Sequence, residues 1–169
     1  PASKGTGTTP RAAKATVDPA ANEGSQARPV ARGTGRKEIV AKLIAAKANV
    51  DLADNNGAPA LYVASDKGHK EIVDKLIAAK ANVDLAAKDG STALHVASGK
   101  GRKEIVDKLI AAKANVDLAT SNGATALYVA SDKGHKETVD KLIAAKAKRD
   151  LAAQDGSTAL HFPSPTEIG

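Results

Sequence analysis

The chain has 169 residues and a net charge of +6, and only 2% of its residues are aromatic, with no Trp, Met or Cys. Its buried layers must therefore be built from Ala, Val, Ile and Leu. The absence of Cys excludes disulfides, thiolate metal sites and a cysteine nucleophile, and it favours an intracellular location, cytoplasmic or, as the alternative, nuclear. No apolar run approaches the ~20 residues of a membrane span and no signal-peptide pattern opens the chain, so we expect no membrane contact.

A period of 33 residues runs through the sequence. The segment GRKEIVAKLIAAKANVDLA, which begins at Gly35, returns with few changes at Gly68, Gly101 and Gly134 without an insertion or deletion. A unit of this length cannot bury a core of its own, so each repeat must stack on its neighbours. The period therefore predicts a solenoid.

Residues 1–34 follow the register of the repeat but lack its core. Pro19 and Arg28 stand where the intact units have leucine. Proline inside a helix costs ~3 kcal/mol, and a charge on a buried face costs more. We expect this degenerate segment to be irregular or disordered.

The intact register predicts an array of helices over residues 35–162. A partial repeat (35–53) should contain a long helix near 36–46. Three full repeats (54–86, 87–119 and 120–152) should each supply a short and a long helix, near 59–67 and 69–79, 92–100 and 102–112, and 125–133 and 135–145. The apolar periodicity of these segments carries the prediction.

The array should end in a second partial repeat over 153–162. Pro163 and Pro165 stop its first helix and lead into an irregular tail over 163–169. Both ends of the array then leave an apolar stacking face poorly covered. This arrangement suggests a longer array, improvised caps or self-association through the poorly capped ends.

The third repeat shows how the helices are delimited. Asp89-Gly90 is a turn signal because glycine tolerates positive φ, and Thr92 after it is an N-cap candidate for the short helix. Gly101 separates the two helices. The long helix carries a one-sided apolar stripe that must face a neighbour: Ile105, Val106, Leu109 and Ile110.

Turn, short helix, tight loop and longer helix, with the sequence G-S-T-A-L-H from Gly90 to His95, resemble the ankyrin repeat. The resemblance implies an all-α ankyrin-repeat solenoid of stacked helix-turn-helix units with β-turn fingers. One departure bears on stability, because the glycine that usually ends the second helix is a lysine in every unit: Lys47, Lys80, Lys113 and Lys146. If that backbone is left-handed, each lysine costs up to ~1 kcal/mol relative to glycine.

The resemblance also implies the binding of another protein by the concave surface of turn tips and short helices. Partner contacts are expected beside the turn glycines and at the exposed ends of the first helices: Asn55, Asn56, Ala58, Asp66, Lys67, Lys88, Asp89, Ser91, Gly99, Lys100, Ser121, Asn122, Ala124, Asp132 and Lys133. This set is polar and contains no aromatic residue, whereas binding hot spots favour Trp, Tyr and Arg. High affinity is not indicated.

The four histidines are the obvious candidates for catalysis, but each sits in the repeat register. We expect His95 and His161 to make hydrogen bonds between repeats, and His69 and His135 to pack in the solvent-side loops. No second histidine lies three to five residues from a first, so no metal site is predicted. With no catalytic residues and no cofactor motif, the sequence does not indicate an enzyme.

Two other hypotheses remain open. Lys67, Lys100 and Lys133 recur along one edge and could bind nucleic acid or another polyanion with the basic N-terminal segment. No aromatic stacking platform accompanies these lysines, so we rank this reading below protein binding. The array could instead be a structural or regulatory segment of a larger protein.

The repeats also alternate with a period of 66 residues, because Tyr62 and Tyr128 take the place of His95 and His161.

On every long helix a glutamate precedes a lysine by four residues. This spacing predicts ion pairs within each helix: Glu38–Lys42, Glu71–Lys75, Glu104–Lys108 and Glu137–Lys141.

Overall fold

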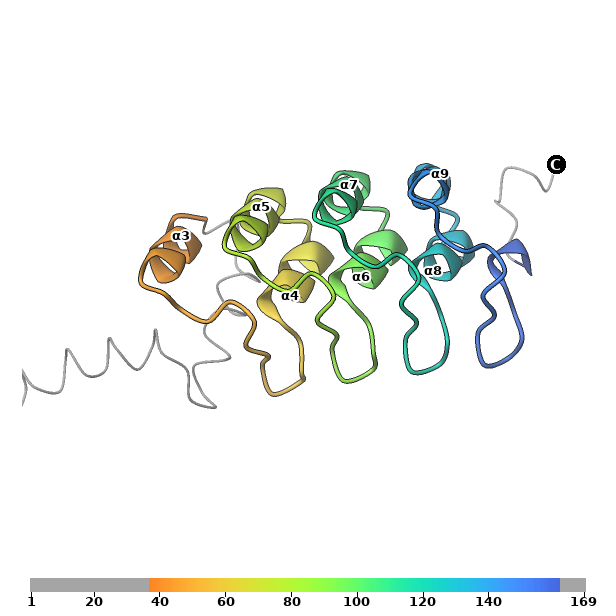
Figure 1. The fold of residues 1–169 in the computed structure, drawn as a ribbon, viewed down its shortest axis with the longest axis horizontal. Helices are drawn as coiled ribbons and strands as arrows, with labels where there is room; N and C mark the ends of the chain where they lie inside the picture. The colour runs from red at the N-terminus through yellow and green to blue at the C-terminus, as the bar shows by residue number, and fades with distance from the viewer. Residues whose placement is uncertain (1–36, 162–169) are drawn as a thin grey trace, which may run out of the picture.

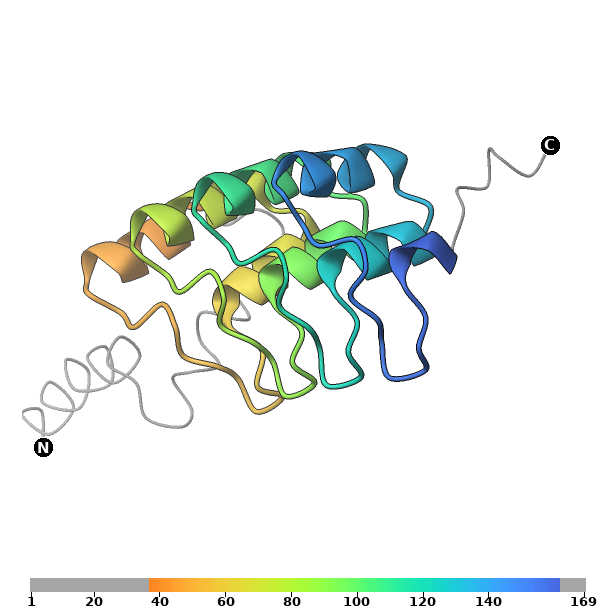
Figure 2. The same ribbon diagram turned by 45° about the vertical axis from the view of Figure 1, so that its right-hand side comes forward.

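A computed structural model describes residues 37–161, in which helix pairs follow one another along the array (Figure 1). The described helices are, in chain order, α3 (Lys37–Ala45), α4 (Ala60–Lys67), α5 (Lys70–Ala78), α6 (Ala93–Gly99), α7 (Lys103–Ala111), α8 (Ala126–Asp132), α9 (Lys136–Ala144) and the 3-10 helix η1 (Ala159–His161). The long helices α3, α5, α7 and α9 form one layer, which we call the outer layer. The short helices α4, α6 and α8 form an inner layer, from which the connecting loops project (Figures 1 and 2).

The projecting loops, which we call fingers, comprise residues 53–59, 86–92, 119–125 and 152–158. They contain turns, and in two of them isolated antiparallel bridges join Ala53 to Pro59 and Ala119 to Thr125. The ankyrin-repeat solenoid with its fingers is therefore confirmed.

The seven α-helix bounds expected from the periodicity are confirmed to within one residue. Each short helix ends where a glycine adopts a left-handed backbone, with φ of 77° at Gly68, 64° at Gly101 and 70° at Gly134. No helix in this part of the chain has the length and apolar composition needed to span a bilayer. The expectations for residues 1–34 and for the tail over 163–169 lie outside the described residues.

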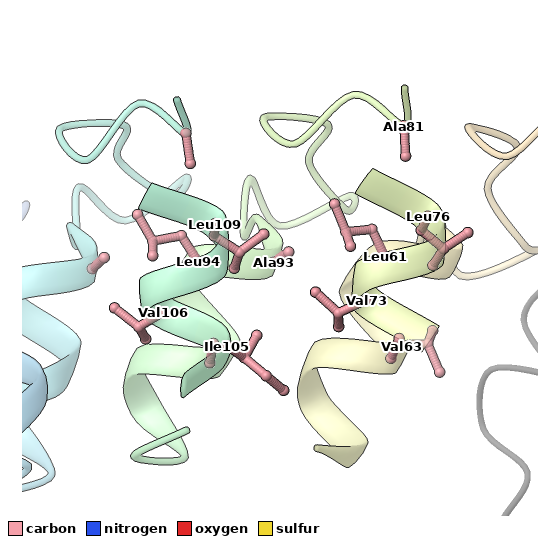
Figure 3. Close-up of a cluster of buried hydrophobic side chains, with 14 of the residues drawn as sticks. Leu61, Val63, Val73, Leu76, Ala81, Ala93, Leu94, Ile105, Val106 and Leu109 are labelled. Carbon is pink, nitrogen blue, oxygen red and sulfur yellow. The ribbon is translucent and has the colours of Figure 1, made fainter. Parts of the chain in front are cut away.

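The core lies between the two helical layers and continues from one repeat to the next (Figure 3). Leu94, Ala97, Val106 and Leu109 of the third repeat are at most 1% exposed. Alanine at the contact positions of the short helices lets neighbouring backbones approach closely. The aliphatic composition therefore suits thin layers that repeat at a fixed spacing.

Each long helix ends in a Schellman motif with lysine at its left-handed position. The four lysines have φ between 65° and 68°. In the third repeat, Lys113 N–H donates to Ile110 O (2.9 Å) and Ala114 N–H donates to Leu109 O (3.0 Å). The backbone at these lysines is thus left-handed, which is the condition under which the sequence indicated a cost relative to glycine.

The ion pairs of the outer layer join neighbouring repeats, which differs from the pairing predicted within each helix. Lys108 Nζ lies 2.7 Å from the Asp74 carboxylate, and Lys141 Nζ lies 2.6 Å from the Asp107 carboxylate. The stacking distance between outer helices is short enough for a lysine to reach the preceding repeat. The prediction of Glu104–Lys108 and Glu137–Lys141 pairs was wrong because it treated each helix in isolation.

Candidate functional site

The fingers are closed by backbone hydrogen bonds around a left-handed glycine. In the third repeat, Ala87 N–H donates to Ser91 O (2.8 Å), Gly90 N–H donates to Ala87 O (2.9 Å), and Gly90 has φ of 80°. Ser91 N–H also donates to the Asp89 carboxylate (3.0 Å), and this bond lowers the pKa of Asp89. These local bonds hold each finger in one conformation.

Neighbouring fingers are also bonded to one another. Ser121 N–H donates to Asp89 O (2.8 Å), and Lys88 Nζ donates to Asn55 O (2.7 Å). The Gln154 side chain donates to Ser121 O (2.7 Å) in the same way. The fingers therefore form a connected row, and the Lys88 ammonium already has a partner within the array.

His95 ties the inner layer to the next finger. Its Nδ1 accepts from Thr92 N–H (3.1 Å), while its Nε2 faces Leu118 O (3.0 Å) and Ala124 O (3.1 Å). Because Nε2 meets carbonyl oxygens it must carry the proton, so the ring is the neutral Nε2–H tautomer. Burial lowers the pKa of His95. The hydrogen bond between repeats that the sequence predicted for His95 is confirmed.

The other histidines have different surroundings. His135 is half-buried and its Nε2 donates to Gly99 O of the preceding repeat (3.0 Å), so it does more than pack in a solvent-side loop. His161 is exposed, and its Nδ1 accepts from Thr158 N–H (2.9 Å). Within residues 37–161, no three metal-ligating side chains come together.

Two adjacent grooves lie on the surface formed by the fingers and the exposed side of the short helices, which we call the finger face. The first has a volume of about 360 Å³ and lies between the second and third repeats. The second has a volume of about 420 Å³ and lies between the third and fourth repeats. Asp89 lines both grooves, so they adjoin at this residue.

Most of the residues predicted to contact a partner lie at the surface. Ten are exposed: Asn55, Asn56, Lys67, Lys88, Asp89, Lys100, Ser121, Asn122, Asp132 and Lys133. Three more are half-buried: Asp66, Ser91 and Gly99. Eight of these thirteen line one of the grooves: Asn56, Asp66, Lys67, Lys88, Asp89, Ser91, Ser121 and Asn122.

Two predicted contact residues are buried, which corrects the sequence-based assignment. Ala58 is 9% exposed and Ala124 is 6% exposed. Each follows the turn glycine, where the chain returns toward the short helix and its carbonyl closes the finger. Ala58 O accepts from Asp54 N–H (3.2 Å), and Ala124 O accepts from Thr120 N–H (2.9 Å). Their side chains are therefore poor candidates for contact with a partner.

Tyr62 is a groove residue that the sequence-based set omitted. It is half-buried and lines the first groove together with Asp66 and Asp89. Burial raises the pKa of its hydroxyl, and the negative charges of Asp89 and Asp66 raise it further. The finger face is thus not free of aromatic groups. The alternation of Tyr and His between repeats was the feature of the sequence that could have identified Tyr62 as a groove residue.

The lysines that recur along the finger face lie beside carboxylates. Lys67 Nζ is 3.4 Å and Lys100 Nζ is 3.9 Å from Asp66, and Lys133 Nζ is 2.9 Å from Asp132. These pairs are exposed and individually weak. They nevertheless reduce the positive potential that a polyanion would meet at this edge.

Comparison with known proteins identifies the family of this chain. A family model described as "Ankyrin repeats (3 copies)" matches residues 29–120 and again residues 100–165, so the two matches together span residues 29–165. No curated protein matches the chain. The matched residues include the whole array of helices and fingers described above, and the chain belongs to the ankyrin repeat family.

Proposed function

We propose that this chain binds a partner protein through the finger face. Ankyrin repeats generally serve as protein–protein interaction modules. The observation that carries the proposal is the pair of adjoining grooves between successive fingers, with volumes of about 360 and 420 Å³. Most of their lining consists of residues that the sequence had already assigned to partner contact.

The finger face can bind a partner with little loss of conformational entropy. The bonds within and between fingers fix the backbone before a partner arrives, and preorganisation of this kind reduces the free energy that ordering would consume on binding. Asn56 lines the first groove and Asn122 lines the second, and both offer short polar side chains. A partner with an extended segment could occupy both grooves at once.

Tyr62 is the residue from which we expect the largest contribution. Tyrosine is enriched in binding hot spots because it combines a large apolar area with a hydrogen-bonding hydroxyl. Asp66 and Asp89 line the groove beside the ring, and their negative charges act on its hydroxyl. This combination favours a partner that presents an arginine side chain, which can stack on the ring and donate to the carboxylates.

The outer layer is a weaker candidate surface. Its charged side chains are engaged in ion pairs between repeats, such as Lys108–Asp74 and Lys141–Asp107. A partner that binds there would have to displace these pairs. The new ion pairs that it could form at the exposed surface would contribute little binding free energy. We therefore expect changes on the outer layer to leave binding unaltered.

The test begins with capture of partners by the full chain and their identification by mass spectrometry. Binding is then measured by calorimetry for Asn56→Arg, which fills the first groove from an exposed position, and for Tyr62→Ala. Ala78→Arg introduces the same side chain at an exposed position of α5 and serves as the control. We expect at least a tenfold loss for both groove variants, about 1.4 kcal/mol, and none for the control.

The opposite ranking, with Ala78→Arg harmful and both groove variants neutral, would refute the finger face as the binding surface. A double change of Lys100 and Lys133 to alanine separates the protein and polyanion hypotheses. If this double variant loses affinity for arbitrary DNA and for the captured protein alike, and if both losses depend steeply on salt, polyanion binding is favoured instead.

A further inference from the structure

The two ends of the array expose opposite halves of the same apolar contact. Inside the array, Ile105 is 1% exposed, whereas its counterpart Ile39 at the start of the array is 41% exposed. At the other end, Ile143 is 39% exposed, whereas its counterpart Ile110 is partly buried against the core. Ile39 on the first described outer helix and Ile143 on the last are therefore both accessible to a partner.

The charges of the outer layer have the same complementarity. Between neighbouring repeats, an aspartate of the earlier helix pairs with a lysine of the later one, as in Asp107–Lys141. A lysine of the earlier helix also pairs with a glutamate of the later one, as in Lys103–Glu137. If the same pattern continued by one repeat, Asp140 of α9 would pair with a lysine and Lys136 of α9 would pair with a glutamate.

The start of the array offers these two groups in the correct order. Lys42 and Glu38 of α3 occupy the same positions as Lys141 and Glu137 of α9. A hydrogen bond from a backbone N–H also joins neighbouring repeats: Lys148 N–H donates to the Asp117 carboxylate of the preceding repeat (2.7 Å). The equivalent acceptor at the end of the array is Asp150, and the equivalent donor at its start is Asn49 N–H.

The fifth repeat is described only in its first half. Residues 153–161 form a finger and η1, and Leu160 of η1 is 81% exposed although its counterpart Leu94 is 1% exposed. Leu94 lies on α6, which packs against α4, α7 and α8, whereas η1 packs against α8.

We propose that two copies of this chain associate head to tail, so that α3 of the second copy packs beside α9 of the first copy at a contact that we call the joint. Asp140 and Lys136 then meet Lys42 and Glu38 of the second copy, and Ile143 is covered. Leu160 of η1 in the first copy lies near α3 of the second copy and is covered as well.

The inner layer continues through this joint without a change of pattern. His95 bonds to the carbonyl oxygen of Leu118 at the end of its own repeat and to that of Ala124 in the following repeat. By the same spacing, His161 would reach the carbonyl oxygens of Leu52 and Ala58 of the second copy. The alternation also continues, because the tyrosine repeat that contains Tyr62 of the second copy follows the histidine repeat of the first.

The contact is heterologous, so each copy that joins by one end keeps its other end available for a further copy. The net charge of +6 on every copy opposes association, whereas the apolar and paired groups of the joint favour it. Association should therefore increase with protein concentration. Moderate salt should weaken the repulsion between copies as well as the exposed ion pairs of the joint.

Sedimentation equilibrium of the full chain over a range of concentrations tests the proposal. The unchanged chain should show a weight-average mass that rises with concentration. Asp140→Lys and Lys42→Glu each place like charges across the joint and should raise the dissociation constant roughly fivefold. An equimolar mixture of the two variants restores opposite charges at every joint between unlike variants and should associate more tightly than either variant alone.

A second pair of variants separates the joint from general surface effects. Ile143→Arg places a charge in the apolar contact at the end of the array, whereas Ala78→Arg adds the same charge at an exposed position in its middle. Only the first should abolish association, and circular dichroism should show both to be folded. A chain that stays monomeric at all concentrations, or variants whose mixture associates no better than either alone, would overturn the proposal.

Discussion

Lysine at the end of each long helix combines a favourable hydrogen-bond motif with an unfavourable backbone conformation. Lys113 has φ of 67°, where a side chain bearing Cβ is strained and glycine is not. The sequence identified this position through its departure from the family pattern. The structure shows that the backbone at this position is left-handed.

We expect Lys113→Gly to stabilise the chain by up to about 1 kcal/mol, because it relieves the strained φ and keeps the Schellman hydrogen bonds. Urea denaturation of the variant and of the unchanged chain measures the difference. Lys108→Gly is the matched control inside the same helix, where glycine should destabilise. Stabilisation by both substitutions would show that the left-handed backbone is not the cause.

His95 makes the stability of the array depend on pH. Its pKa is lowered in the folded chain by burial, so below about pH 6.5 the unfolded chain binds more protons at this site than the folded chain does. Stability from this residue is therefore complete above pH 6.5 and falls as the pH decreases toward the lowered pKa. Protonation of Nδ1 would also remove the acceptor that Thr92 N–H requires.

An NMR titration of the histidine rings should show one ring with a clearly lower pKa than an unperturbed histidine, and its signal should be absent from the His95→Gln variant. Denaturation at pH 8 and pH 5.5 should show a loss of stability at the lower pH that is smaller in this variant. An identical pH dependence in the variant would contradict the assignment to His95.

At the scale of the helices, packing is tight in the third repeat and looser at α3. Leu109 is 0% exposed, whereas its counterpart Leu43 is half-buried and lines a cavity of about 20 Å³ beneath α3. The sequence anticipated this difference because the repeat before α3 has lost its core residues. It could not anticipate how far each side chain would be covered.

Leu109→Ala should destabilise the chain by ~2 to 5 kcal/mol, because it leaves a cavity in a layer that is packed from both sides. Leu43→Ala should cost less, since its side chain is already partly in contact with water. Denaturant titrations of both variants provide the comparison. Equal losses would mean that α3 is as tightly held as α7.

At the scale of the whole molecule, stability should decrease from the middle of the array toward its ends. Each repeat contacts mainly its neighbours, so the terminal elements α3 and η1 have fewer buried groups than α6 and α7. Native-state hydrogen exchange should be slowest in α6 and α7 and fastest in α3 and around Ala159–His161. Uniform protection along the array would instead indicate global unfolding as a single unit.

Most of the architecture followed from the sequence because each repeat packs against near-identical copies of itself. The period determined the number and spacing of helix pairs, the glycines determined where short helices end, and the apolar stripes determined which sides face the core. The buried positions of Ala58 and Ala124 were missed, because whether a residue beside a turn points outward depends on how the finger closes.

The sequence by itself determined the family and the helix bounds, since each of these depends on a pattern that every repeat shares. The hydrogen bond of His95 to the next repeat followed from the place of this residue in the repeat register. Only the tertiary structure decided that the outer lysines pair between repeats, that Tyr62 lines a groove together with Asp66 and Asp89, and that Ile39 and Ile143 are exposed. These features arise from distances between repeats, which depend on how closely the helices stack, and no single repeat contains that information.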